Sequence, residues 1–167
     1  MAAQTGRTQG KYVKFQLEDS GGTFRDLPVN MINGVGLDYP EVDVSAIQDA
    51  VKGFLPGQPD ASLEISGPFD SAAAQAASGS GSAAALSGSH TVLNDLPGGV
   101  TPLGFAVYIG IRHDWETGEP VWGLASSAAN GILCINFKVN PIDGTYTASF
   151  RFFPGSAAPA WGTAAIS

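Results

Sequence analysis

The chain has 167 residues, 44% of them hydrophobic, a length and composition that suit one folded domain and argue against wholesale disorder. Charged residues make up only 14% and the net charge is −7, which argues against tight binding of nucleic acid, because such binding depends on Lys and Arg. Small neutral residues, including 22 Gly, fill the gap, and a surface of this kind is easily covered by another protein because few charges need desolvating.

The cysteine content and the apolar pattern limit the classes further. Cys134 is the single cysteine, so it forms no intramolecular disulfide and belongs to no zinc motif. We find no N-terminal apolar segment of the signal-peptide type and no apolar run long enough to cross a bilayer. We therefore expect a chain that is made and folded in a cytoplasm.

The first third predicts a flexible arm followed by short strands. Residues 1–10 show no periodicity and predict the arm, and residues 11–167 are expected to form one domain. Residues 11–17 alternate between apolar and polar side chains, which predicts a half-buried strand. Residues 24–32 predict a second extended stretch with an edge strand or bend at Pro28, because proline cannot donate to a β-ladder.

The middle third has weaker patterns. Residues 41–60 are irregular, and the apolar residues of their second half suggest a short helical turn that ends at Pro56-Gly57. Residues 61–66 return to strand-like alternation. The Ala/Ser/Gly-rich segment 71–90 predicts an insert: a short helix capped by Asp70 and running to Ala77, then a run that is either a linker or a packing surface of small residues.

The last third has the clearest strands. Residues 103–112 alternate, and residues 133–139 place four apolar side chains on one face. Residues 140–144, with the sequence NPIDG, predict a hairpin loop, and the return strand 145–152 alternates again. The sequence therefore predicts a mainly β fold, a single-domain sandwich or barrel with one short helix.

Catalytic and metal-binding patterns are sparse. His90 and His113 lack metal-ligand spacing, and the segment 113–116 (HDWE) is interpreted as a solvated hairpin tip, with a cation site as the alternative. Cys134 lies inside a strand and is expected to pack as a small hydrophobe. No nucleophile elbow or P-loop is present. We therefore predict no catalytic residues, no cofactor and no metal.

Two weaker alternatives come from acidic and aromatic residues. Asp43 and Asp49 are interpreted as capping and turn residues, while a hydrolase built on such acids stays a minor hypothesis. Trp115, Trp122 and Trp161 are expected in the core or an interface, although exposed tryptophans would suit stacking on sugars.

Two blocks of sequence together resemble the major tail tube proteins of bacteriophages. The first block consists of VDVS at residues 42–45, an acid at 49, KGFLPG at 52–57, DA at 60–61 and EISGPFD at 64–70. The second block consists of VNPIDG at residues 139–144, a strand at 146–153, PG at 154–155 and WGTA at 161–164. The resemblance covers most of residues 11–165, and the order of both blocks in one chain supports it more than either block alone.

The resemblance implies a β-sandwich of the phage tail-tube type that assembles with itself into rings, stacked as a hollow tube through which the genome passes. It implies a virion location, other tail proteins as partners (terminator, tape measure and distal tail proteins), DNA that passes without tight binding, and no membrane insertion. The chain departs from the family in segment 71–90 and in lacking an obvious long stacking loop. A minor tail component, a capsid decoration protein or a glycan-binding virion module therefore stays an alternative.

The resemblance also assigns residues to roles. The N-terminal arm and residues 45–60 are hypothesised to contact adjacent rings. The contact residues are expected to be Val44, Ser45, Asp49, Lys52, Phe54, Leu55, Pro56 and Gly57. A polar stripe that could line the bore is formed by Thr145, Thr147, Ser149 and Arg151.

Overall fold

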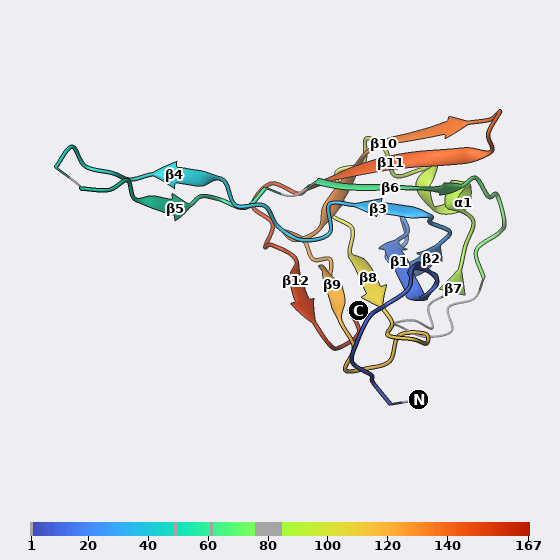
Figure 1. The fold of residues 1–167 in the computed structure, drawn as a ribbon. Helices are drawn as coiled ribbons and strands as arrows, with labels where there is room; N and C mark the ends of the chain where they lie inside the picture. The colour runs from blue at the N-terminus through green and yellow to red at the C-terminus, as the bar shows by residue number, and fades with distance from the viewer. Residues whose placement is uncertain (1, 49, 61, 76–84) are drawn as a thin grey trace.

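The computed structural model describes residues 2–48, 50–60, 62–75 and 85–167 of the chain. The fold is a sandwich of two β-sheets, from which a long two-stranded arm projects to one side (Figure 1). Within the described residues there is one short α-helix, α1 (Ser89–Leu93), and a 3₁₀ turn, η1 (Gly10–Tyr12). The predicted mainly β class with one short helix is confirmed.

The first sheet, sheet A, has six strands in the order β12-β9-β8-β1-β2-β7. Its central pair is β1 (Val13–Glu18) and β8 (Phe105–Ile109), which run antiparallel with Phe15 opposite Val107. The other members are β2 (Phe24–Leu27), β7 (Ala85–Leu86), β9 (Val121–Leu124) and β12 (Ala160–Gly162). The alternation read from residues 11–17 and 103–112 therefore belongs to neighbouring strands.

The second sheet, sheet B, has four strands in the order β10-β11-β6-β3. The strands β10 (Ile132–Asn140) and β11 (Thr145–Phe152) form the hairpin that the NPIDG loop predicted. They are followed by β6 (Ser62–Pro68) and the short β3 (Met31–Asn33). The strands β10 and β3 are the two edges of this sheet.

Pro28 lies where the chain leaves one sheet for the other. The strand β2 ends at Leu27 in sheet A, and β3 begins at Met31 in sheet B, so the bend predicted at Pro28 is present. The hydroxyl of Tyr146 donates a hydrogen bond to the Pro28 carbonyl at 2.8 Å. A Cβ on Gly67 would lie 2.3 Å from the same carbonyl oxygen, so only glycine fits beneath the bend.

The core lies between the two sheets and is closed at one end by α1. Sheet A contributes Phe15, Leu17 and Phe105, sheet B contributes Ile65 and Phe150, and all five are 0% exposed. Leu93 of the helix joins the same cluster. At about 25 cal/mol per Å² of buried apolar surface, this cluster is the main source of the stability of the fold.

Sheet A is also covered on its outer face. Ala106 and Tyr108 pack there with Trp115 and Val121, and the C-terminal residues Ala165 and Ile166 lie against them. The Ile166 amide donates a hydrogen bond to the Tyr108 hydroxyl oxygen at 3.0 Å. Two covered faces explain why four consecutive residues of β8, Phe105 to Tyr108, are buried.

Three local expectations are wrong. Residues 70–75 are not helical: the Asp70 carboxylate accepts the Ala72 amide in a turn, and residues 76–84 lie outside the described part. A β-bulge between Cys134 and Asn136 leaves Ile135 55% exposed, so the apolar residues of 133–139 do not share one face. The HDWE segment is not a solvated tip, because His113 and Trp115 are buried.

Candidate assembly surfaces

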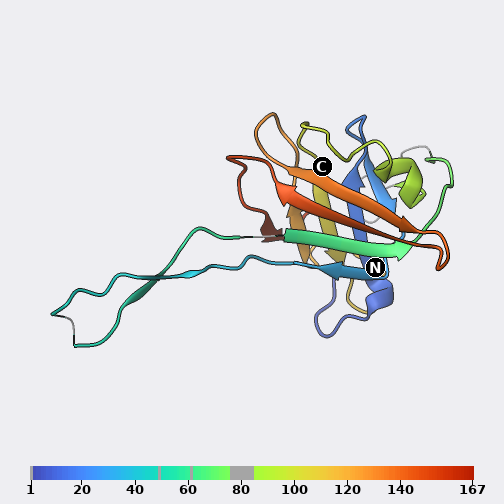
Figure 2. The ribbon, with the colours of Figure 1, turned by 90° about the horizontal axis from the view of Figure 1, so that it is seen from above.

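The arm is a twisted two-stranded ribbon built from residues 38–60. Its strands are β4 (Glu41–Asp43) and β5 (Phe54–Pro56), which pair antiparallel with Val42 opposite Leu55. Further main-chain hydrogen bonds extend the ladder beyond these strands, from the Val44 amide to the Gly53 carbonyl at 2.9 Å and from Gly57 to Pro40 at 2.7 Å. Figure 2 shows that the ribbon extends well away from the sandwich.

The two faces of the arm differ in chemistry. Because side chains alternate along a strand, Val42, Val44 and Leu55 share one face, while Glu41, Asp43 and Phe54 share the other. The side chains of Val42, Val44 and Leu55 are 46%, 51% and 57% exposed, so the described part of the monomer leaves about half of this apolar face in water. An isolated two-stranded ribbon is marginal in water, which makes a covering partner the physical expectation.

The arm is also strongly acidic. Residues 38–60 contain Asp38, Glu41, Asp43, Asp49 and Asp60 against the single cation Lys52, so five negative charges and one positive charge give −4 of the total −7. Hydrogen bonds from the Ser45 side chain and amide lower the pKa of Asp43, which keeps this carboxylate ionised at neutral pH. The arm therefore presents an apolar face flanked by negative charge.

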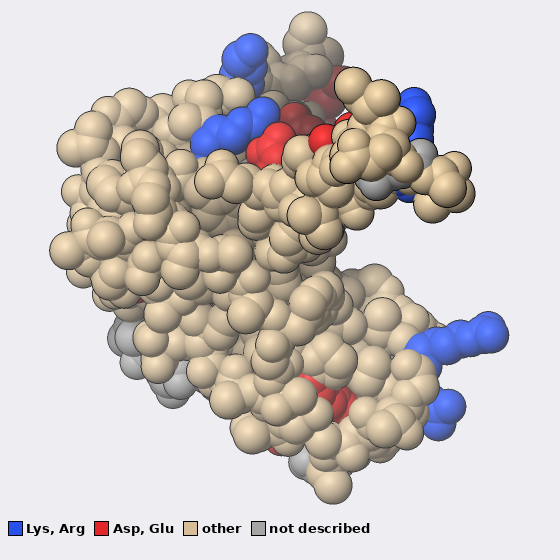
Figure 3. Space-filling view, turned by 90° about the vertical axis from the view of Figure 1, so that its left-hand side faces the viewer, with Lys and Arg blue, Asp and Glu red and all other residues tan. Residues whose placement is uncertain are grey.

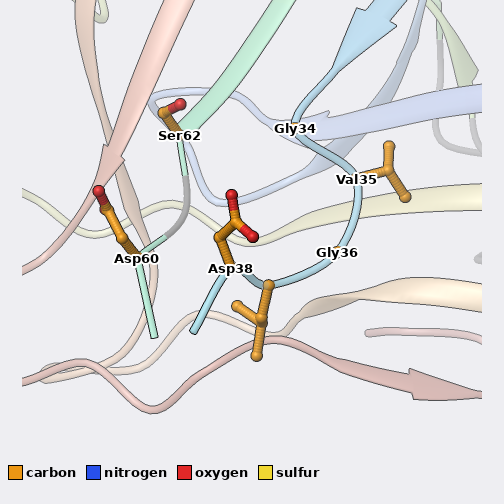
Figure 4. Close-up of a pocket in the computed structure, with 7 residues that line it drawn as sticks. Gly34, Val35, Gly36, Asp38, Asp60 and Ser62 are labelled. Carbon is orange, nitrogen blue, oxygen red and sulfur yellow. The ribbon is translucent and has the colours of Figure 1, made fainter. Parts of the chain in front are cut away.

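The base of the arm is held by paired main-chain bonds. Asp38 and Asp60 exchange amide-to-carbonyl hydrogen bonds at 3.1 and 2.7 Å. Gly34, at φ +85°, turns the chain from β3 toward the arm, and a Cβ there would lie 1.7 Å from the Ser62 carbonyl oxygen. Figure 4 shows the small pocket between these segments, lined by both aspartates and by Ser62.

The individually named contact residues belong to this arm, apart from Asp49, which lies outside the described residues, while the N-terminal segment predicted to share the contact lies elsewhere. Two expectations about the region are wrong. The apolar residues Phe54 and Leu55 form strand β5 rather than a helical turn, and the chain does carry a long projecting loop. Whether these residues contact a neighbouring ring stays a prediction.

An apolar groove runs along the open side of the sandwich. It lies between β3 of sheet B and β1 and β8 of sheet A, and it is lined mainly by Val13, Val29, Met31, Ile32, Val35 and Ile109. Met31 and Val35 at its lip are 42% and 36% exposed. Figure 3, which looks toward the tip of the arm, shows a deep hollow with uncharged walls on this side of the molecule.

One exposed cation adjoins this groove and another lies against the N-terminal segment. Gly10 contributes to its lining, and Lys11 follows directly and is exposed. Arg112 is exposed, and its guanidinium reaches within 3.6 Å of the Cβ position at Gly6, so Arg112 and the N-terminal segment are neighbours. Figure 3 shows Lys or Arg side chains projecting below the hollow.

The predicted bore stripe lies on the outer face of sheet B. Tyr146, Ala148 and Phe150 point into the core, so the alternate residues of β11 point outward: Thr145, Thr147, Ser149 and Arg151. Pairing places Glu64 and Asn136 beside Ser149, and Lys138 beside Thr147. This face is mainly polar and carries Lys138 and Arg151 against Glu64, but its role as a bore lining stays a prediction.

The N-terminal segment is held against the β8–β9 loop through a buried carboxylate. Glu119 is 0% exposed and accepts the amide of Gln4 at 3.0 Å, with His113 Nε2 3.4 Å away. Burial acts to raise the pKa of Glu119, but the hydrogen bonds and the nearby imidazole outweigh burial and lower it. The predicted flexible arm 1–10 thus has defined contacts, which also include a hydrogen bond from the Thr8 hydroxyl to the Gly110 carbonyl.

The remaining chemical candidates form no site. Among the described residues there is no group of three or more His, Cys, Asp or Glu that could hold a metal. Cys134 is buried among apolar side chains, which raises its pKa to about 11, as expected for a packing residue. Trp115 and Trp122 are buried, so of the three tryptophans only Trp161 presents an exposed ring.

Sequence reasoning missed the groove and the length of the arm. The arm carried a signal, since Val42 and Val44 alternate with Glu41 and Asp43 and the Pro56-Gly57 pair ends β5. The groove carried none, because its walls come from β1, β3 and β8, whose residues lie far apart in the chain and meet only after the sheets pack.

Comparison with known proteins shows the fold. No family model and no curated protein matches the sequence. A chain in the cryo-EM structure of the anti-feeding prophage tube-terminating cap is similar, with a TM-score of 0.61 and 10% identity over 98% of this chain and 96% of that one.

Two further chains give the same result. One belongs to the sheath/tube terminator of the extracellular contractile injection system PVC in its extended state, with a TM-score of 0.58 and 9% identity, covering 96% of this chain and 99% of that one. The other belongs to the anti-feeding prophage baseplate, with a TM-score of 0.57 and 11% identity, covering 97% of both. The fold is thus shared over its whole length with components of phage-tail-like particles.

No helix among the described residues is long and apolar enough to cross a membrane.

Proposed function

We propose that this chain is a non-enzymatic structural subunit of a phage tail or tail-like particle, which assembles with copies of itself into rings that stack as a hollow tube. The observation that carries the proposal is the arm: an apolar ribbon whose residues Val42, Val44 and Leu55 remain about half exposed in the described part of the monomer. Large exposed apolar surfaces mark sites of protein–protein contact.

The edges of sheet B support ring formation. The strands β10 and β3 are the edges of sheet B, and within the described residues no other strand pairs with them on the outer side, although Ile132 at the start of β10 forms an isolated bridge with Leu103. An unpaired edge is a template for another strand, and a contact between two different edges repeats around a ring until it closes. The polar outer face of sheet B would then line the inside of the ring.

The surface chemistry fits a conduit for nucleic acid. The outer face of β11 carries Thr145, Thr147 and Ser149, with Arg151 as its cation. A nearly neutral lining in an acidic protein would let DNA pass without the counterion release that drives tight binding. The fold shared with tube-terminator and baseplate components supports a tail role, and a terminator or other minor component is the second candidate because those chains share the whole fold.

Electron microscopy of variants tests the proposal. Changing Phe54 and Leu55 to Asp, or deleting residues 1–10, should abolish tubes while the monomers keep the far-UV circular dichroism of the wild type. Ile142→Asp is a matched control, because Ile142 is 94% exposed at the tip of the β10–β11 hairpin, away from the arm. Tubes of normal length from the arm variants would overturn the assigned role of the arm.

A further inference from the structure

The apolar face of the arm and the apolar groove are two separate surfaces of opposite shape. The arm is a projecting ribbon and the groove is a recess along the open side of the sandwich (Figures 2 and 3). Both are exposed in the monomer, with Leu55 at 57% on one and Met31 at 42% on the other. Removing either surface from water would lower the free energy.

We infer that the groove of one copy receives the apolar face of the arm of a second copy, an inference that rests on the proposed self-assembly and names the surface that receives the arm. Val42, Val44 and Leu55 would lie against Val13, Val29, Met31 and Ile32. The arm cannot fill its own groove in the structure, because it extends away from the sandwich (Figure 1).

Charge complementarity favours the arm as the occupant. The arm carries a net charge of −4, and the face that bears Glu41 and Asp43 would remain outside the groove after docking. Lys11, which directly follows the groove residue Gly10, is an exposed cation, and the exposed Arg112 lies beside Gly6 of the N-terminal segment. Opposite charges on the two partners orient the encounter and select the direction in which the ribbon lies.

The contact would be heterologous, since arm and groove are different patches of the same chain. A heterologous contact leaves a free arm at one end of every dimer and a free groove at the other, so it propagates. This is the behaviour required of a subunit that builds rings or stacks of rings. A twofold dimer, in contrast, would use both surfaces at once and stop.

Cysteine crosslinking in assembled protein tests the inference. In a Cys134→Ala background, we would mix chains carrying Leu55→Cys with chains carrying Met31→Cys and treat the assemblies with bismaleimidoethane. Thiols held side by side react at effective concentrations of roughly millimolar, so we expect covalent dimers at a yield at least about tenfold above the control. The control pairs Leu55→Cys with Ile142→Cys, which lies outside the groove.

The outcomes separate this inference from the proposed function. Two results would overturn the arm as the occupant and leave self-assembly intact, provided that assemblies are visible by electron microscopy. In the first, Leu55→Cys crosslinks to Ile142→Cys as well as to Met31→Cys. In the second, Met31→Cys crosslinks to Thr5→Cys of the N-terminal segment rather than to Leu55→Cys. Absence of assemblies from the parent Cys134→Ala chain and the wild type overturns both the inference and the proposed function. A charge exchange gives a second readout: Arg112→Glu should weaken assembly, and Glu41→Lys in the same chain should restore part of it.

Discussion

The sandwich and the arm are both β-structure with alternating apolar residues, but these residues are buried in the sandwich and largely exposed in the arm. Phe150 in β11 is 0% exposed, whereas Phe54 in β5 is 49% exposed. In the sandwich, each apolar face finds a second sheet within the same chain. In the arm, two strands form a separate ribbon that pairs with no other strand of the described residues.

The comparison shows that alternation of apolar and polar residues indicates which side chains favour burial, but not whether the same chain or a partner buries them. The apolar face of a strand can pack against its own domain or against a neighbouring molecule, and the sequence pattern is the same in both cases. Here the exposed ribbon also carries most of the net charge of the chain, and net charge far from zero opposes non-specific association.

The largest expected difference between the two regions concerns stability. Phe150→Ala should lower the free energy of unfolding by about 3–5 kcal/mol, because it leaves a cavity in the core. Phe54→Ala should cost much less, about 0.5 kcal/mol, because the side chain is half exposed and belongs to no buried core cluster. Urea unfolding of dilute monomers measures both. Equal losses for the two variants would mean that the arm packs on the sandwich in solution.

The junction between the regions should respond next. Gly34→Ala should destabilise the protein by about 2–3 kcal/mol, because the new Cβ would meet the Ser62 carbonyl in a left-handed backbone. Gly36→Ala is the matched control: its φ is also positive, but a Cβ there meets nothing within 4 Å, so about 1 kcal/mol is expected. Hydrogen exchange at the Asp38 and Asp60 amides would show whether the base of the arm opens. Equal costs for both variants would contradict a rigid base.

A buried and an exposed aspartate extend the comparison to charge. Burial raises the pKa of Asp26 in sheet A from 3.8 to about 6, with Lys14 opposing the shift and Asp114 adding to it. The folded state therefore holds the proton more tightly, and the stability that this gives is full below pH 3.8 and is lost as the pH rises through about 6.

Asp26→Asn should remove that slope and stabilise the monomer at pH 7 by about 1–3 kcal/mol, with no gain near pH 3.5. Asp43→Asn in the arm should lower the pH 7 unfolding free energy only slightly, because the hydrogen bonds from Ser45 that lower the pKa of Asp43 are exposed to solvent. Urea titrations at several pH values provide the measurement. A stabilisation that is the same at both pH values would show that burial of the charge is not its cause.

The smallest effect is expected at the N-terminal segment. Glu119→Gln should speed hydrogen exchange at the Gln4 amide, because a neutral amide oxygen accepts a weaker hydrogen bond than a carboxylate. Glu64→Gln, on the exposed face of sheet B, is the control and should leave that amide unchanged. If the wild-type Gln4 amide already exchanges at the rate of an unfolded peptide, the segment is not held by Glu119.

Much of the sandwich could be predicted from the sequence, because its strands alternate and end at recognisable turns. The NPIDG loop predicted the β10–β11 hairpin, and Pro28 predicted a bend, although not that the chain crosses there from one sheet to the other. The burial of segment 113–116 could not be predicted from its polar sequence. It depends on the buried Glu119 carboxylate, which accepts hydrogen bonds from three main-chain amides and lies close to the His113 ring.

The candidate site was predictable only in part. The arm residues were expected to make contacts, but Phe54 and Leu55 were assigned to a helical turn, since three consecutive strand residues, Phe54 to Pro56, are too few to show alternation. The bulge at Ile135 was invisible because one inserted residue shifts the register without changing the composition. The groove depends on how two sheets pack and has no local signature.

Electron microscopy of the purified wild-type protein at high concentration tests the central claim most directly. If copies of this chain cover the apolar face of one another's arms, the grids should show rings or hollow filaments of uniform width. A population that stays at the 17.1 kDa monomer under the same conditions, with the arm still exposed, would contradict the account.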